Sequence, residues 1–145
     1  MKNNKGITMV SLIITVIILV ILAGTTTYMA DRITRQVKVE NAKTNMLLIQ
    51  AHIKTIAEKH SFDEENNALK GTLETIDTEK YGVDASKDYY LLSEQDLIDM
   101  NLGSVEYNDG YYVCYDTEEI IFIRGVKNSQ GKVLYSLTQM KEENV

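Results

Sequence analysis

Polar and apolar positions divide the start of the chain into a short basic segment and a long apolar one. Residues 1–6 are polar and basic, residues 7–24 carry no charge, and residues 25–30 extend the run without adding one. A helix rises about 1.5 Å per residue, so some 20 apolar residues cross the roughly 30 Å hydrocarbon core of a bilayer. The pattern therefore predicts a membrane helix over 7–30.

Beyond this run, apolar residues recur at alternating spacings of three and four. This stripe consists of Val39, Ala42, Met46, Ile49, Ile53 and Ile56. Charged residues lie off the stripe, as in a helix that buries one face. No proline or glycine interrupts residues 25–69, so we expect one helix from about residue 7 to about residue 60. The stripe favours burial under the chain's own sheet, and a coiled coil with another subunit is the alternative.

The C-terminal part has the short alternating segments of a small antiparallel sheet. The expected extended segments are 89–92, 105–107, 111–115, 119–123 and 132–136, joined by turns at 108–110, 116–118 and 128–131. They predict a meander of three or four strands, with the polar residues 60–70 forming a loop before it. We expect Ile120, Phe122 or their alternates to cover the helical stripe.

One short helix interrupts these strands. Ser93 is a good N-cap, Asp96 stands at the third helical position, and Gly103 follows the last periodic residue. These signals predict a helix over 94–101. The fold class is therefore α+β, with a long N-terminal helix packed against a small C-terminal sheet.

Charge is distributed unevenly between the two parts. Residues 6–30 contain no charged side chain, whereas 21 acidic and 13 basic residues follow position 30, a formal net charge of −8. An acidic domain argues against nucleic-acid binding as the main function. Cys114 is the one cysteine, so neither an internal disulfide nor a cysteine-based metal cluster can form.

The domain lacks the side-chain patterns of an enzyme. His52 and His60 are eight residues apart, too far along a helix to chelate one ion as an i,i+4 pair would. The acidic run 63–67 lacks the alternation of a calcium loop, and no nucleophile-elbow, phosphate-loop or zinc signature occurs. Cys114 favours a buried structural thiol over a nucleophile. We expect no catalytic, cofactor or metal site.

Tyrosine is concentrated in the C-terminal part, with eight of the nine between residues 81 and 135. Cross-strand packing explains most of them. The alternative is an exposed tyrosine surface that contacts a sugar or a protein partner.

Three interpretations fit the N-terminal 24 residues. A secretory signal has the same order of charge and apolar run, with 21–23 as an acceptable cleavage sequence. A plain single-span anchor is the second. The third is a prepilin signal, in which the cleavage glycine precedes the apolar run, so that the run stays in the mature protein. Gly6 stands in that place.

The sequence Lys5-Gly6 followed by residues 7–13, ITMVSLI, resembles the cleavage and N-methylation motif of type IV prepilins and pseudopilins. The resemblance implies that a prepilin peptidase cuts after Gly6 and methylates Ile7. The family usually carries Glu at the fifth mature position, where this chain has Ser11. The pattern, together with a looser likeness over 89–126, is similar to prepilin-like proteins of clostridial Gram-positive bacteria.

From this resemblance we expect a pilin-like organisation. Its parts are a leader peptide over 1–6, a transmembrane or filament-core helix over 7–30, its amphipathic continuation over 31–60 and a sheet domain over 61–145. The expected function is that of a pilin, minor pilin or pseudopilin in a type IV pilus-like or type II secretion-like filament. The alternative is a non-polymerising single-span envelope protein with an extracytoplasmic, partner-binding domain.

The expected partners are the membrane, the prepilin peptidase and other pilin-like subunits, without nucleic acid. The N-inside orientation follows from the resemblance, because basic residues flank the run on both sides. Thr8, Ser11 and Thr15 share a face of the membrane helix. Their hydroxyls either pack against a neighbouring helix in the filament core or bond their own backbone one turn back.

Overall fold

A computed structural model describes the backbone of residues 4–143 and the side chains of 8–25 and 29–143. The chain forms two compact units, Met1–Arg35 and Gln36–Val145. Helix α1, Asn4–Phe62, begins in the first unit and ends in the second. A helix of 59 residues is possible because the chain contains no proline. Its last turn contains the basic residues Lys59 and His60, which interact favourably with the negative end of the helix dipole.

The stripe on α1 is the helical half of the hydrophobic core. Val39, Met46, Ile49 and Ile53 are at most 2% exposed and belong to one cluster with the sheet. Ala42 and Ile56 lie at its edges, partly buried. The interpretation of the stripe as the chain's own core is therefore confirmed.

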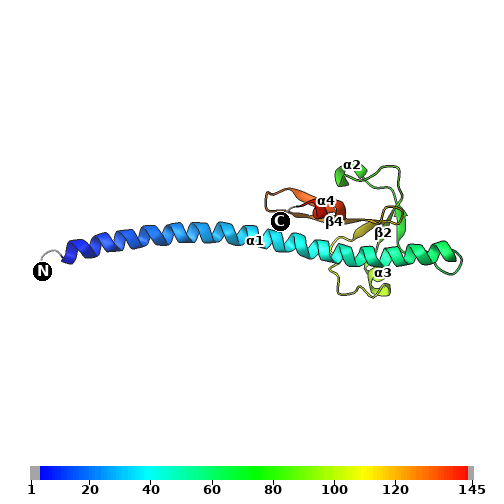
Figure 1. The fold of residues 1–145 in the computed structure, drawn as a ribbon, viewed down its shortest axis with the longest axis horizontal. Helices are drawn as coiled ribbons and strands as arrows, with labels where there is room; N and C mark the ends of the chain where they lie inside the picture. Colours follow the sequence, from blue (N-terminus) through cyan, green and yellow to red (C-terminus); the bar gives the residue numbers. More distant parts are fainter. Residues whose placement is uncertain (1–3, 144–145) are drawn as a thin grey trace. The chain divides into compact units, whose positions relative to one another are not determined.

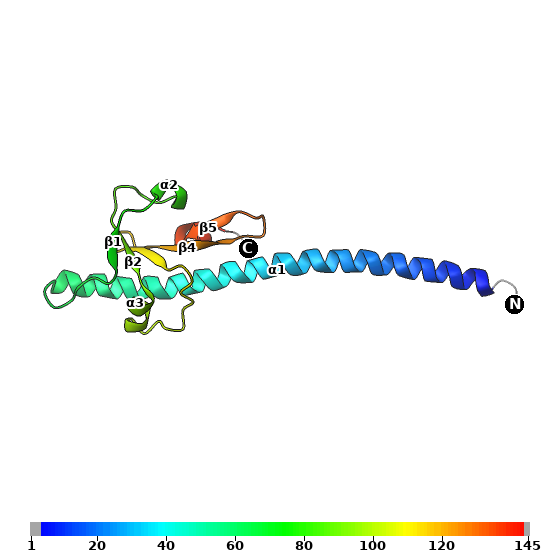
Figure 2. The same cartoon turned by 180° about the vertical axis from the view of Figure 1, so that it is seen from behind.

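The sheet has five antiparallel strands in the order β1-β2-β3-β4-β5, so neighbours along the chain are neighbours in the sheet. The strands are β1 Thr72–Glu74, β2 Tyr89–Leu92, β3 Tyr111–Cys114, β4 Glu119–Lys127 and β5 Val133–Ser136. Figure 2 shows β1 at one side of the sheet and the β4–β5 hairpin at the other. The α+β class and the antiparallel meander were predicted correctly, but the sheet has five strands instead of the expected three or four, and β1 was not among the expected segments.

The face of the sheet toward α1 is apolar. Leu92, Tyr111, Val113, Ile120, Phe122 and Leu134 lie in the same cluster as the stripe. Alternate residues of a strand point to opposite faces, so this one set defines the register of the whole sheet. Ile120 and Phe122 face the helix, as expected.

The opposite face of the sheet is also covered. Helix α2, Thr78–Tyr81, lies on the side away from α1 (Figure 1), and its Tyr81 is 5% exposed. The Tyr81 ring meets the rings of Tyr112 and Tyr135 edge-on, with centroids 6.0 and 5.2 Å apart. Cys114 and Ile121 are buried beneath this cover. The sheet is therefore the middle of three layers.

Helix α3, Glu94–Asp99, begins where the sequence predicts and ends earlier. The Ser93 hydroxyl accepts from the Asp96 amide, and the Asp96 side chain accepts from the Ser93 amide, which completes a capping box. Asn101, with φ of 60°, is the left-handed residue that ends the helix, in place of the expected Gly103. The Leu102 amide then donates to the Leu97 carbonyl.

The prediction of a strand over 105–107 is wrong. Strand β3 is already paired on both sides, with β2 and with β4, so it has no free edge for a further strand. Val105 instead inserts into the core as part of a loop, where it is 6% exposed. The Tyr107 carbonyl accepts from the Gly110 amide at 2.9 Å, so the turn at 108–110 does form.

A last helix, α4 (Leu137–Glu142), follows β5 and was not predicted. Ser136 and Gln139 form its capping box. Leu137 and Met140 are each 1% exposed and pack in the cluster that contains the α1 stripe. The carboxylate of Glu119 on β4 accepts from the amide and hydroxyl of Thr138, which ties the start of α4 to the sheet.

Candidate membrane and processing segment

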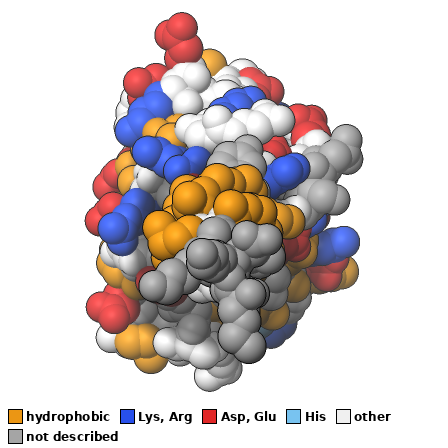
Figure 3. Space-filling model, turned by 90° about the vertical axis from the view of Figure 1, so that its left-hand side faces the viewer, with side chains coloured by type: hydrophobic (Ala, Val, Ile, Leu, Met, Phe, Trp, Pro, Cys, Tyr) orange, Lys and Arg blue, Asp and Glu red, His pale blue; other side chains and the backbone are white. Residues whose placement is uncertain are grey.

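The first part of α1 presents apolar side chains to its surroundings on every side. Each large apolar residue from Met9 to Leu22 is 50–66% exposed. Figure 3, which looks at the side where α1 begins, shows hydrophobic side chains gathered near the centre of the view. Soluble proteins rarely expose so large an apolar surface. The helix is long and apolar enough to cross a membrane.

The predicted processing residues lie at the start of this helix. Gly6 and Ile7 are in its first turns. Residues 1–3 of the expected leader, and the side chain of Ile7, lie outside the described residues.

The hydroxyl-bearing residues of the run lie on the exposed surface of α1. Thr8, Ser11 and Thr15 are all exposed. The Thr15 hydroxyl donates to the Ser11 carbonyl at 2.7 Å. Of the two alternatives, bonding to the helix's own backbone or to a neighbouring helix, the first is therefore present at Thr15. A hydroxyl that donates its proton keeps its oxygen as an acceptor. Thr15 can therefore still accept a hydrogen bond from a neighbouring helix.

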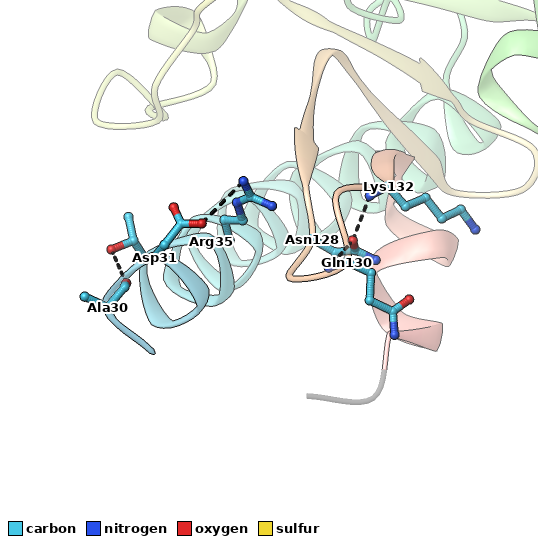
Figure 4. A network of polar contacts seen from close by, with 7 residues as sticks. Ala30, Asp31, Arg35, Asn128, Gln130 and Lys132 are labelled. Carbon is cyan, nitrogen blue, oxygen red and sulfur yellow. Dashed lines mark hydrogen bonds and ion pairs between the residues drawn. The ribbon is translucent and has the colours of Figure 1, made fainter. Parts of the chain in front are cut away.

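Charged residues resume directly after the run. Asp31 and Arg35 form an i,i+4 ion pair with a carboxylate–guanidinium distance of 3.4 Å (Figure 4). The Thr34 hydroxyl donates to the Ala30 carbonyl at 2.8 Å on the same stretch of helix. Both interactions are exposed, and an exposed ion pair contributes less than about 1 kcal/mol. They mark the end of the uncharged segment of α1.

The residues considered for catalysis and metal binding make structural contacts. His52 Nδ1 lies 3.0 Å from the Leu48 carbonyl, and His60 Nδ1 lies 2.8 Å from that of Asn67. Cys114 is 1% exposed within the tyrosine-covered face. No group of three metal-binding side chains occurs among the described residues.

Three tyrosine hydroxyls connect the sheet to loops, a role that the sequence pattern did not reveal. Tyr89 donates to the Asp84 carbonyl at 2.7 Å, Tyr111 to that of Glu106 at 2.7 Å, and Tyr115 to that of Lys70 at 2.6 Å. Burial raises the pKa of each of these tyrosines to about 12. The only signal in the sequence was the abundance of tyrosine.

Asn128 organises the turn between β4 and β5. Its side-chain oxygen accepts from the amides of Gln130 and Lys132, both at 2.9 Å (Figure 4). Its amide group donates to the Glu143 carboxylate at 2.8 Å. Although polar, Asn128 is only 2% exposed, and these bonds satisfy its side chain. The predicted turn is thus also the anchor of the segment after α4.

Comparison of the chain with protein-family models, with curated proteins and with solved structures finds no match.

Proposed function

We propose that this chain is a prepilin-like subunit of a type IV pilus-like or type II secretion-like filament. One observation carries the proposal: a glycine stands directly before an exposed apolar run, and the same helix continues into a stripe buried under an antiparallel sheet. Cleavage after Gly6 would leave that run at the start of the mature protein. A secretory signal would lose it, and with it the membrane anchor.

In this proposal a prepilin peptidase removes residues 1–6 and methylates Ile7. The mature run spans the cytoplasmic membrane once, with residues 61–145 on the outer side, until neighbouring subunits replace the lipid around it. Helix–helix association within a membrane depends on close packing and on hydrogen bonds between helices. Thr8, Ser11 and Thr15 supply small hydroxyl side chains on one face for that purpose.

The second candidate is a monomeric envelope protein whose domain binds a partner. Ser11 favours it, because a hydroxyl cannot neutralise the terminal amine of a neighbouring subunit as a carboxylate would. The bond from Thr15 to the Ser11 carbonyl also satisfies one hydroxyl within a single chain.

Glycine substitutions in α1 separate these functions. Gly6→Ala should block processing and remove the protein from sheared surface fibres. Gly24→Ala is the matched control: a methyl group there meets nothing within 4 Å, so processing and fibre recovery should be normal. Unchanged processing and location in Gly6→Ala would refute the motif. Correct processing without any fibre would favour the monomeric envelope protein.

The hydroxyl face has its own test. Thr15→Leu keeps the run apolar and removes the hydroxyl, so processing should be normal and fibre recovery reduced if Thr15 packs between helices. Full fibre recovery would mean that the Thr15 hydroxyl serves only its own backbone.

A further inference from the structure

The helix segment directly after the apolar run combines exposed apolar and basic side chains. Met29 and Ile33, four residues apart and therefore neighbours on the helix surface, are 61% and 55% exposed. Arg32 and Arg35, three apart, lie on the adjoining face of the helix, because Arg32 is also three residues from Met29. A helix with both kinds of side chain beside a hydrophobic span suits the boundary between lipid tails and headgroups.

The two arginines differ in how far their charge is already neutralised. Arg35 forms the ion pair with Asp31 at 3.4 Å (Figure 4). Arg32 is exposed and makes no ion pair within the described part of the chain. The guanidinium group is a fork of donors that matches the oxygens of a phosphate. Arg32 therefore offers a full, accessible phosphate-binding group where the run ends.

We propose that Arg32 and Arg35 bind the headgroups of anionic phospholipids, while Met29 and Ile33 lie among the upper acyl chains. Charge complementarity selects this occupant. The two guanidinium groups carry the charge opposite to that of the headgroup phosphates and attract them locally, although the residues after position 30 carry a net charge of −8. The inference requires that the apolar run spans a membrane, and it does not require a filament.

The chain contains no tryptophan, so one introduced tryptophan is the only indole that can report on its surroundings. Quenching of its fluorescence by labelled lipids tests the proposal. The full chain with Ile33→Trp is reconstituted into mixed vesicles of phosphatidylcholine and phosphatidylglycerol, with brominated acyl chains on one lipid or the other. Brominated lipid quenches the new indole only where it is adjacent. Phosphatidylglycerol should be enriched at this site about fivefold over its bulk share, since one basic residue near the surface contributes about 1 kcal/mol.

Charge variants of the same reporter identify the arginines as the cause. Arg32→Gln with Arg35→Gln should remove the enrichment, whereas Asp31→Asn should increase it by releasing Arg35. Lys127→Gln with Lys132→Gln, in the β4–β5 hairpin, is the control with an equal change in net charge and should leave the enrichment intact. High salt should weaken the enrichment.

Two results would overturn the proposal and are distinguishable. Strong but equal quenching by both lipids would show an inserted helix without lipid preference, which leaves the filament function open. Absence of quenching by either lipid would refute the membrane span itself, and with it the proposed function.

Discussion

Individual tyrosines hold the loops of the domain against its sheet. The hydroxyls of Tyr89, Tyr111 and Tyr115 each donate to a main-chain carbonyl outside the sheet. Each of these hydrogen bonds is partly buried, and a bond of this kind contributes about 0.5–1.5 kcal/mol to stability. These tyrosines therefore stabilise segments that have little secondary structure of their own.

Tyr115→Phe should lower the free energy of unfolding by about 1–2 kcal/mol, because the Lys70 carbonyl loses its partner at 2.6 Å. Tyr112→Phe is the matched control on the same segment. Its hydroxyl lies 3.5 Å from the Glu74 carboxylate, too far for a strong bond, and its loss should cost less than about 0.5 kcal/mol. Urea unfolding of the full chain in detergent, followed by circular dichroism, gives both values. Equal losses would contradict the role of the loop bond.

Buried tyrosines also make stability depend on alkaline pH. The unfolded chain ionises tyrosine at a pKa of about 10, whereas burial raises the pKa of Tyr111 and Tyr115 to about 12. The folded state binds these protons more tightly, so their contribution is fully present below about pH 10 and is lost as the pH rises toward 12. Urea unfolding at a series of pH values should show this decline, smaller in Tyr111→Phe. A constant free energy of unfolding over that range would contradict it.

Gly125 is a second position where one residue determines local geometry. Its φ is +72°, and an added Cβ would lie 2.6 Å from Val133 Cγ1 and 2.7 Å from the Tyr135 ring. Gly125→Ala should therefore destabilise the β4–β5 hairpin by at least about 1–3 kcal/mol. Gly103→Ala is the control, since its nearest contact would be at 3.8 Å and its φ is not positive. Thermal unfolding compares the two, and equal midpoints would refute the steric argument.

Among the elements, the second part of α1 contributes most directly to the core. Met46→Ala should lower the free energy of unfolding by about 2–5 kcal/mol, because Met46 is fully buried against the sheet. Leu47→Ala, one residue further and 39% exposed, should cost less than about 1 kcal/mol. Urea unfolding in detergent measures both. Equal costs would mean that the stripe does not pack as described.

The sequence predicted elements whose signals are local. The period of the stripe identified the buried face of α1, and the Ser93–Asp96 capping box identified the start of α3. The strand expected over 105–107 failed because pairing depends on which edges are free, and both edges of β3 were occupied. Periodicity indicates which side chains of a strand face the core, but it does not indicate which other strand pairs with it.

Local sequence patterns also did not predict that α2 covers the face of the sheet away from α1. Tyr81 stands on a helix of four residues, too short to leave a periodic signal, yet it packs across Tyr112 and Tyr135. The candidate site shows the same limit. Gly6 and Ile7 follow from a motif, whereas the loop bonds of the tyrosines and the anchor at Asn128 required coordinates.

At the scale of the whole molecule, the two parts of α1 have different surroundings. Residues after Gln36 bury their apolar stripe within the chain, whereas the run from Met9 to Leu22 has no cover among the described residues. Under the proposed function, the processed chain would keep that run and exchange lipid for neighbouring subunits. The other interpretations either remove it or leave it joined to residues 1–6.

The mature N-terminus tests this central claim most directly. Mass spectrometry of the protein recovered from its native envelope should find a chain that begins at a methylated Ile7. A chain that begins at Gly24 would indicate ordinary signal-peptide cleavage, and an intact Met1 would indicate a plain anchor. Either result would contradict the account.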